Sequence, residues 1–205
     1  MFCFPKDKSQ KITMEKQILK SIFLKEIRVS DDEFDDIASL FKVQKIAKKK
    51  LFIVEGGKAN QLGFVISGGF FSTIMNTKGE KTVLRFAFEN SLIGDLTSFF
   101  SGGLSHLDFT ALEESVVLTI TLNDLQTITD KYPVVEKLLR VRILDLYIQS
   151  QKRTFSAINT DAKERYSLLL ENNPNIAQRV SQSLIASYLG IKAESLSRIR
   201  KQLFL

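Results

Sequence analysis

The chain has 205 residues, of which 44% are hydrophobic and 25% charged. This composition is typical of a globular protein whose buried core is stable without disulfide bonds or structural metal ions. Its single cysteine, Cys3, excludes an intramolecular disulfide and a cysteine-based zinc or iron–sulfur site, which fits a reducing compartment such as the cytoplasm. The net charge is +6, no apolar run reaches the roughly 18 residues that span a bilayer, and residues 1–11 lack the apolar stretch of a signal peptide, so we expect no membrane partner.

The N-terminal part of the sequence predicts two helices. Residues 11–26 have the apolar spacing of an amphipathic helix, and a second helix is expected at about residues 31–41. The start of the second helix is marked by Ser30-Asp31-Asp32-Glu33, in which Ser30 is the N-cap and Glu33 closes a capping box.

Between residues 48 and 121 the pattern changes to short apolar runs separated by turn signals, several of them glycine pairs. Several short strands at regular spacing predict an antiparallel barrel or sandwich. In the run 81–88, Val83, Arg85 and Ala87 should share one face, because side chains alternate along a strand. The expected strands are 51–54, 62–66, 69–75, 81–88, 107–112 and 116–121.

Helical periodicity returns after Thr121. A short helix capped by Asn123 is expected at 123–130, and Pro133 suits the first turn of a long helix that runs to about Phe155. The long helix is apolar on two faces and therefore needs two partners. We favour an arrangement in which one face packs on the barrel of the same chain and the other packs on a second copy of the chain. The alternative is a helix that is fully buried in a monomer. The predicted dimerisation residues are Leu138, Val141, Leu144, Ile148 and Phe155.

The C-terminal segment predicts a pair of short helices. A helix at 162–171, capped by Asp161, is ended by Asn172-Asn173-Pro174. An apolar helical face at 184–189 is then followed by Gly190, where a positive φ is easily adopted, and by a second helix with Ile191, Leu196 and Ile199 on its apolar face. Two short helices joined by a glycine turn form a helix-turn-helix.

The second of these helices directs polar and cationic residues outward. Residues 151–205 hold nine Lys or Arg and four Asp or Glu, a net charge of +5, which attracts phosphate. Arg can donate to guanine and Glu can accept from cytosine in the major groove, while hydroxyls contact phosphate. The alternative is a helical hairpin with a charged outer face, but the packing signature of Ala186 and Gly190, together with the local basic charge, favours duplex DNA as the partner. The predicted DNA-binding residues are Ser181, Lys192, Ala193, Glu194, Ser197, Arg198 and Lys201.

The segment from Ala186 to Lys201 resembles the helix-turn-helix of the Crp/Fnr family of transcription regulators, the cyclic-AMP receptor protein and its relatives. The resemblance implies that Glu194 and Arg198 read bases and that Ser181 contacts phosphate, while Ala193 stands where many members have another Arg.

The resemblance extends over nearly the whole chain and implies an α+β fold with an antiparallel barrel or jelly-roll sensor domain. It places the barrel and N-terminal helices at residues 1–130, a long dimerisation helix at 131–158 and the helix-turn-helix domain at 159–205. Because the chain stops at Leu205, we expect the family's two-stranded wing to be absent or short.

The family's phosphate-binding cassette is matched only in part. Gly94-Asp95-Leu96 resembles its Gly-Glu-Leu, with a carboxylate one methylene shorter, and Ser105 stands where the family has a phosphate-binding Arg. A buried phosphate without a cationic partner is unfavourable, so we expect that cyclic AMP is not bound in the usual mode. Compensating charge from Arg85 or His106, an apolar effector, or no effector at all remain alternatives. The predicted effector pocket comprises Arg85, Gly94, Asp95, Leu96, Ser105 and His106.

The sequence thus predicts a dimeric DNA-binding transcription regulator with a sensor barrel. Its expected partners are duplex DNA, a second copy of the chain and RNA polymerase, and no metal or cofactor is predicted beyond an unidentified small-molecule effector. The alternative is a cyclic-nucleotide-binding module that regulates a protein partner. We do not expect an enzyme, because the sequence has no nucleophile–base pair, metal-ligand spacing or glycine-rich phosphate loop.

Overall fold

The computed structural model describes residues 17–21 and 27–203. Residues 17–21 are helical, while Cys3 and the rest of the predicted helix 11–26 lie outside the described residues. The elements that follow are α2 (Asp31–Ser39), β1 (Lys42–Ile46), β2 (Leu51–Ile53), β3 (Gln61–Ser67), β4 (Phe70–Met75), β5 (Lys81–Ala87), β6 (Leu92–Ile93), α3 (Leu96–Ser101), β7 (Asp108–Ala111), β8 (Ser115–Thr121), α4 (Leu122–Lys131), α5 (Pro133–Asn159), α6 (Ala162–Asn172), α7 (Ile176–Arg179), α8 (Gln182–Leu189) and α9 (Ala193–Leu203).

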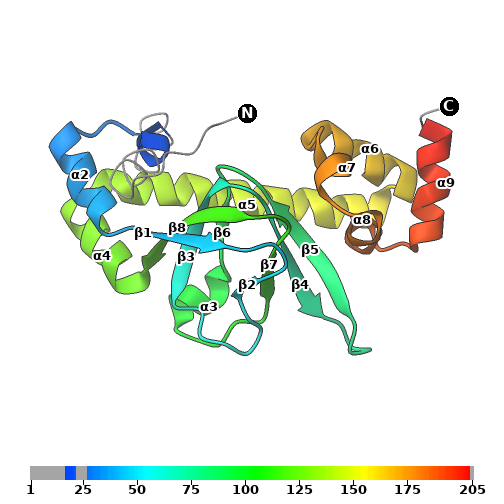
Figure 1. Ribbon diagram of the computed structural model, residues 1–205, viewed down its shortest axis with the longest axis horizontal. Helices are drawn as coiled ribbons and strands as arrows, with labels where there is room; N and C mark the ends of the chain where they lie inside the picture. The colour runs from blue at the N-terminus through cyan, green and yellow to red at the C-terminus, as the bar shows by residue number, and fades with distance from the viewer. Residues whose placement is uncertain (1–16, 22–26, 204–205) are drawn as a thin grey trace. The chain divides into compact units, whose positions relative to one another are not determined.

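The strands form two four-stranded sheets, in the orders β1-β8-β3-β6 and β2-β7-β4-β5 (Figure 1). β8 pairs antiparallel with β1 and with β3, and β2 pairs antiparallel with β7. The predicted antiparallel β architecture, long helix and C-terminal helices are therefore confirmed.

By contacts, the chain divides into two compact units. Unit 1 comprises Met1–Phe70 and Ala87–Ile143, and unit 2 comprises Phe71–Phe86 and Leu144–Leu205. The β4–β5 hairpin thus groups with the C-terminal helices, although it lies in the sequence among the strands.

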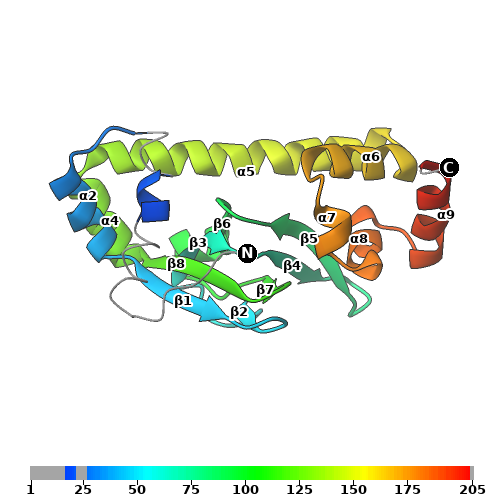
Figure 2. The same ribbon diagram turned by 45° about the horizontal axis from the view of Figure 1, so that its top comes forward.

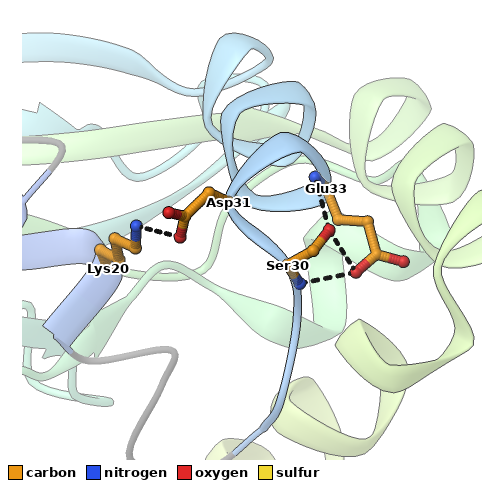
Figure 3. Close-up of polar contacts among 4 residues, drawn as sticks. All are labelled: Lys20, Ser30, Asp31 and Glu33. Atoms are coloured by element: carbon orange, nitrogen blue, oxygen red, sulfur yellow. Dashed lines mark hydrogen bonds and ion pairs between the residues drawn. The ribbon is translucent and has the colours of Figure 1, made fainter.

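The entry to α2 is fixed by the predicted capping box, shown in Figure 3. The N–H of Glu33 donates to Ser30 Oγ at 3.3 Å, and the N–H of Ser30 donates to Glu33 Oε2 at 2.7 Å. Two N–H groups that the helix leaves unpaired are thereby satisfied, and the hydrogen bonds from Ser30 lower the pKa of Glu33. Lys20 forms an ion pair with Asp31 at 2.5 Å.

The core of unit 1 lies between the strands. It consists of buried apolar side chains, in which the rings of Phe52 and Phe70 meet edge-on with centroids 6.1 Å apart. β3 is buried along nearly its whole length because it is covered on both faces. Val65 belongs to the core, while Leu62 and Phe64 line a small apolar cavity with residues of α4 and α5.

One strand, one helix cap and one helix end differ from the prediction. β1 has the weakly alternating sequence Lys-Val-Gln-Lys-Ile, and it becomes a strand by pairing with β8, about 75 residues further along the chain. The predicted cap Asn123 is wrong: the N-cap of α4 is Thr121, whose hydroxyl accepts from the N–H of Asp124 at 3.2 Å. α5 begins at Pro133 as expected and continues to Asn159, beyond the predicted end at Phe155.

The helices of unit 2 enclose a second core. α6 begins after the predicted N-cap Asp161, whose side chain accepts from the N–H of Glu164 at 2.8 Å. Tyr166 and Leu196 are fully buried, and α8 packs against both α6 and α9. The remaining members of this buried set are Leu169, Ile176, Val180, Ile185, Ala186 and Leu189.

Candidate nucleic-acid interface

The turn between α8 and α9 has the predicted glycine geometry. Gly190 ends α8 in the left-handed region, with φ +69°. Its N–H donates to the carbonyl of Ser187 at 3.1 Å, and the N–H of Ile191 donates to that of Ala186 at 3.0 Å. These bonds satisfy carbonyls that the helix end leaves free and set the direction in which the chain enters α9.

α9 is amphipathic, as its sequence predicts. Leu196 is 0% exposed and anchors the inner side of the helix. Lys192, Glu194, Arg198 and Lys201 are all exposed to solvent, while Ala193 and Ser197 are half-buried. The six predicted residues from Lys192 to Lys201 therefore lie on one helix and at its immediate start, with the charged ones free to meet a ligand.

Ser181 lies at the start of α8 rather than on α9. It is the N-cap of α8, and its exposed hydroxyl accepts from the N–H of Leu184 at 3.4 Å. The next residue, Gln182, donates from Nε2 to the carbonyl of Ala193 at 3.2 Å and so joins the starts of the two helices. Gln182 was not predicted, because its partner lies across the turn.

Two arginines hold the end of α8. Arg165 on α6 donates to the carbonyl of Leu189 at 3.1 Å and to that of Thr160 at 2.6 Å. Arg153 on α5 donates to the carbonyl of Tyr188 at 3.3 Å. A guanidinium suits the negative end of a helix, since it offers several donors as well as charge. The sequence gives no signal for these contacts beyond the presence of arginine.

The predicted dimerisation residues differ in their surroundings along α5. Leu138 is 3% exposed and lines the apolar cavity of unit 1 together with Leu139 and Val135, so it already has partners in its own protomer. Val141 is half-buried. Leu144, Ile148 and Phe155 are 48%, 47% and 58% exposed, which is unusual for large apolar side chains on one helix.

Asp95, one of the predicted effector residues of unit 1, is the centre of a hydrogen-bond network with Ser98, Ser105 and His106. This carboxylate caps α3 by accepting from the N–H of Ser98 at 3.2 Å. It also accepts from the N–H of His106 at 2.9 Å and from the hydroxyls of Ser98 and Ser105 at 3.0 and 3.3 Å. Burial raises the pKa of Asp95, but these hydrogen bonds outweigh burial and keep the pKa below its usual value.

The remaining predicted effector groups lie outside this hydrogen-bond network. Gly94 precedes the cap, and a Cβ there would lie 2.6 Å from Leu62 Cδ2. Leu96 is the first residue of α3, and the His106 side chain is exposed. Arg85 belongs to unit 2, and burial lowers its pKa to about 10. Within unit 1 the carboxylate is thus already saturated by protein donors.

The described residues hold no cluster that could bind a metal ion, and the apolar cavity of unit 1 is small. Among these residues, no group of three or more His, Cys, Asp or Glu side chains is arranged as a set of metal ligands. The apolar cavity of unit 1 has a volume of only about 30 Å³. None of the helices in the described ranges is long and apolar enough to cross a bilayer.

Comparison with known proteins gives one family match and several structural ones. Residues 43–132 match the family model for the cyclic nucleotide-binding domain. No curated protein sequence matches the chain. The structure is similar to that of FixK2 from Bradyrhizobium japonicum, with a TM-score of 0.70 and 20% identity over 80% of this chain and 84% of that one.

Two further structures are similar over most of their length. One is the c-di-GMP responsive global regulator CLP of Xanthomonas campestris, with a TM-score of 0.68 and 15% identity over 85% of this chain and 91% of that one. The other is a mutant of CooA from Carboxydothermus hydrogenoformans, with a TM-score of 0.66 and 15% identity over 88% and 81% of the two chains.

These matches define the class of protein. Residues 43–132 match the cyclic nucleotide-binding domain, and in the structure a long helix and a helix-turn-helix follow them. The fold of the chain as a whole is that of the Crp/Fnr transcription regulators, so the resemblance noted in the sequence is confirmed at the level of the fold. Of these structural relatives, CLP is by its description a global regulator.

Proposed function

We propose that the protein is a cytoplasmic, dimeric transcription regulator that binds duplex DNA through α9 and acts with RNA polymerase. Residues 1–130 form its sensor, 131–158 its dimerisation helix and 159–205 its DNA-binding domain. The proposal depends on one observation above all: Glu194, Arg198 and Lys201 are exposed on the side of α9 opposite the buried Leu196, and Lys192 is exposed just before the helix begins. A short helix with such a face fits the major groove.

Arg198 and Glu194 are the proposed base-reading pair. They are four residues apart, so they lie on the same side of the helix one turn from each other. Lys192, Lys201 and the Ser181 hydroxyl would contact phosphate, which fixes the position of the helix without reading sequence. The half-buried Ala193 has no side-chain donor or acceptor, so we assign it only close packing against the DNA.

The proposed dimer uses the exposed apolar residues of α5. Leu144, Ile148 and Phe155 follow one another at intervals of four and seven residues, which keeps them on one side of a helix. Val141 continues this line, and Leu138, at the unit 1 end of it, is buried within its own chain. Two copies related by a two-fold axis would present two α9 helices to successive major grooves, roughly 34 Å apart.

The sensor barrel is proposed not to bind cyclic AMP in the usual mode of the family. Ser105 offers no positive charge, and Asp95 is occupied by Ser98, Ser105 and His106. A cyclic phosphate brought to this site would lack a cationic partner and lie near an ionised carboxylate. Titration calorimetry with cyclic AMP and cyclic GMP tests this point, and low-micromolar binding of either would contradict it.

The DNA-binding proposal is tested by selecting preferred duplexes from a randomised library and measuring their affinity for three proteins. Arg198→Ala should weaken binding to the selected duplex by about 1–3 kcal/mol and relax preference at one base pair, since a bidentate contact to guanine is lost. Lys163→Ala, which removes an exposed charge from α6, is the matched control and should retain the preference. Equal loss on all duplexes would refute base reading by Arg198, and the absence of any selected duplex would refute the proposal.

A further inference from the structure

A contact between the β4–β5 hairpin and the helix-turn-helix, both in unit 2, is centred on Arg153 of α5. Its Nη1 donates to the carbonyl of Leu84 at 2.5 Å, and its Nη2 donates to the carbonyl of Val83 at 3.1 Å. The same Nη2 donates to the carbonyl of Tyr188 in the last turn of α8 at 3.3 Å. One guanidinium therefore joins strand β5 to the end of α8. Figure 2 shows these two elements of unit 2 near each other.

Further contacts join the same two elements. The N–H of Val83 donates to the hydroxyl of Ser187 at 3.1 Å, so a backbone N–H of β5 is hydrogen-bonded to a side chain of α8. The Tyr188 ring lies 5.2 Å from the Phe86 ring, and the Arg153 guanidinium carbon lies 4.7 Å from the centre of the Tyr188 ring. We call Val83, Phe86, Arg153, Ser187 and Tyr188 the hairpin junction.

The residues of the hairpin junction are partly or fully buried. Val83 is buried, and Arg153, Phe86, Ser187 and Tyr188 are half-buried. Burial lowers the pKa of Arg153 and raises that of Tyr188. Removing the guanidinium from such a place would leave carbonyls of β5 and α8 without the donor that now satisfies them.

The position of the hairpin junction on α8 gives it influence over α9. Tyr188 is followed within two residues by Gly190, the left-handed residue from which the chain turns into α9. Arg165 fixes the neighbouring carbonyl of Leu189 from α6. The end of α8, from which the chain turns into α9, is thus held by two arginines, of which only Arg153 also binds the hairpin.

We propose that Arg153 is a positioning residue for DNA recognition, which joins the β4–β5 hairpin to α8 and thereby fixes the orientation of α9. The inference rests on the proposed DNA-binding function of α9. It makes the hairpin a part of the DNA-binding unit, although its sequence lies within the residues that match the cyclic nucleotide-binding domain. Arg153 itself touches no base in this scheme.

The test uses the full-length protein and four variants. Arg153→Met removes the guanidinium but keeps a long side chain, and Arg153→Lys keeps the charge without the planar fork that reaches three carbonyls. Ser187→Ala removes the second polar link of the hairpin junction. Lys152→Met, next to Arg153 but exposed, is the matched control for loss of a positive charge from α5.

The first measurement is hydrogen–deuterium exchange without DNA, which is independent of the DNA-binding proposal. Exchange in residues 81–86 should be about tenfold faster in Arg153→Met and Ser187→Ala, because local opening of β5 becomes easier. Arg153→Lys should restore little of the protection, and Lys152→Met should exchange like the wild type. Unchanged exchange in Arg153→Met would overturn the proposal whatever the protein does with DNA.

The second measurement is affinity for a duplex selected from a randomised library and for a scrambled duplex of the same length. Arg153→Met should lose about tenfold in affinity for the selected duplex and much less for the scrambled one, since α9 is displaced while its charges remain. Equal losses on both duplexes would overturn the proposal, since they indicate a merely structural role. A direct contact between Arg153 and a DNA phosphate would also overturn the proposal. In that case Arg153→Lys would bind DNA as tightly as the wild type, and the slope of log affinity against log salt concentration would fall by about one in Arg153→Met.

Discussion

Asp95 in unit 1 is an example of a residue whose role depends on its hydrogen-bond partners. A carboxylate at this position of the sequence suggests a ligand contact, yet its oxygens accept from the N–H of Ser98 in the first turn of α3, from the Ser105 hydroxyl and from the N–H of His106. The hydrogen bonds keep the pKa of Asp95 below its usual value despite burial. The residue therefore stabilises α3 and the loop that follows it.

This role predicts a loss of stability when Asp95 is changed. Asp95→Ala should lower the free energy of unfolding by about 1–3 kcal/mol, because the cap is lost and buried donors are left unpaired. Since the pKa is lowered in the folded state, the contribution is complete above about pH 4, the pKa in the unfolded chain, and is lost as the pH falls through the folded value. Urea unfolding at neutral and acidic pH measures both effects. Asp95→Asn should unfold with a weaker pH dependence than the wild type, and an identical dependence would contradict the prediction.

Tyr166 presents the opposite case. Its ring is 0% exposed in the core of unit 2, and its hydroxyl has no hydrogen-bond partner among the described residues. An unpaired buried hydroxyl costs free energy, so Tyr166→Phe should leave the stability unchanged or raise it by about 1 kcal/mol. Thermal unfolding gives the answer, with Leu169→Ala as a core control that should destabilise by about 2–5 kcal/mol. A clear destabilisation by Tyr166→Phe would mean that the hydroxyl has a partner.

At the scale of secondary-structure elements, β3 shows how a strand is held on two sides. One face packs into the core of unit 1 through Val65, and the other faces α4 and α5 through Leu62 and Phe64. Gly63 lies on the core face of β3, between closely packed side chains. A Cβ at this position would lie 2.6 Å from Val117 Cγ1, 2.9 Å from Ile93 Cγ1 and 3.0 Å from Phe52 Cζ.

Gly63→Ala should therefore destabilise the protein by about 1–3 kcal/mol, because the added methyl group displaces packed side chains. Gly103→Ala is the matched control, since its Cβ would come no closer than 3.2 Å to the exposed Ser101 side chain, and it should change the stability by less than about 0.5 kcal/mol. Urea midpoints measure the two variants side by side. Equal midpoints would show that the core yields to the extra methyl group.

At the scale of the whole molecule, α5 is the element that unit 1 and unit 2 share. Its first turns are buried in unit 1 through Val135 and Leu138, and its later turns leave Leu144, Ile148 and Phe155 exposed. A row of exposed apolar side chains on one helix is best explained by a partner surface. The proposed partner is the same row on a second copy.

Ile148→Lys should convert the proposed dimer into a monomer, because a charge would be buried without a partner at the interface. Gln149→Lys adds the same charge at an exposed neighbouring position and should leave the dimer intact. Sedimentation velocity at micromolar concentration distinguishes the two, and binding of the Ile148→Lys variant to a two-fold symmetric duplex should weaken in parallel. A wild-type protein that sediments as a monomer would overturn the dimer.

The sequence by itself determined the features that depend on neighbours within a few residues. The capping box of Ser30 and Glu33, the positive φ of Gly190 and the amphipathic side of α9 all follow from local hydrogen bonds and helical periodicity. Only the tertiary structure decided that β1 is a strand, that Asp95 is saturated, that Leu138 is buried in its own unit and that Arg153 joins β5 to α8. Each of these depends on a partner that the chain brings close only by folding, and a sequence pattern does not record which distant carbonyl or strand that partner is.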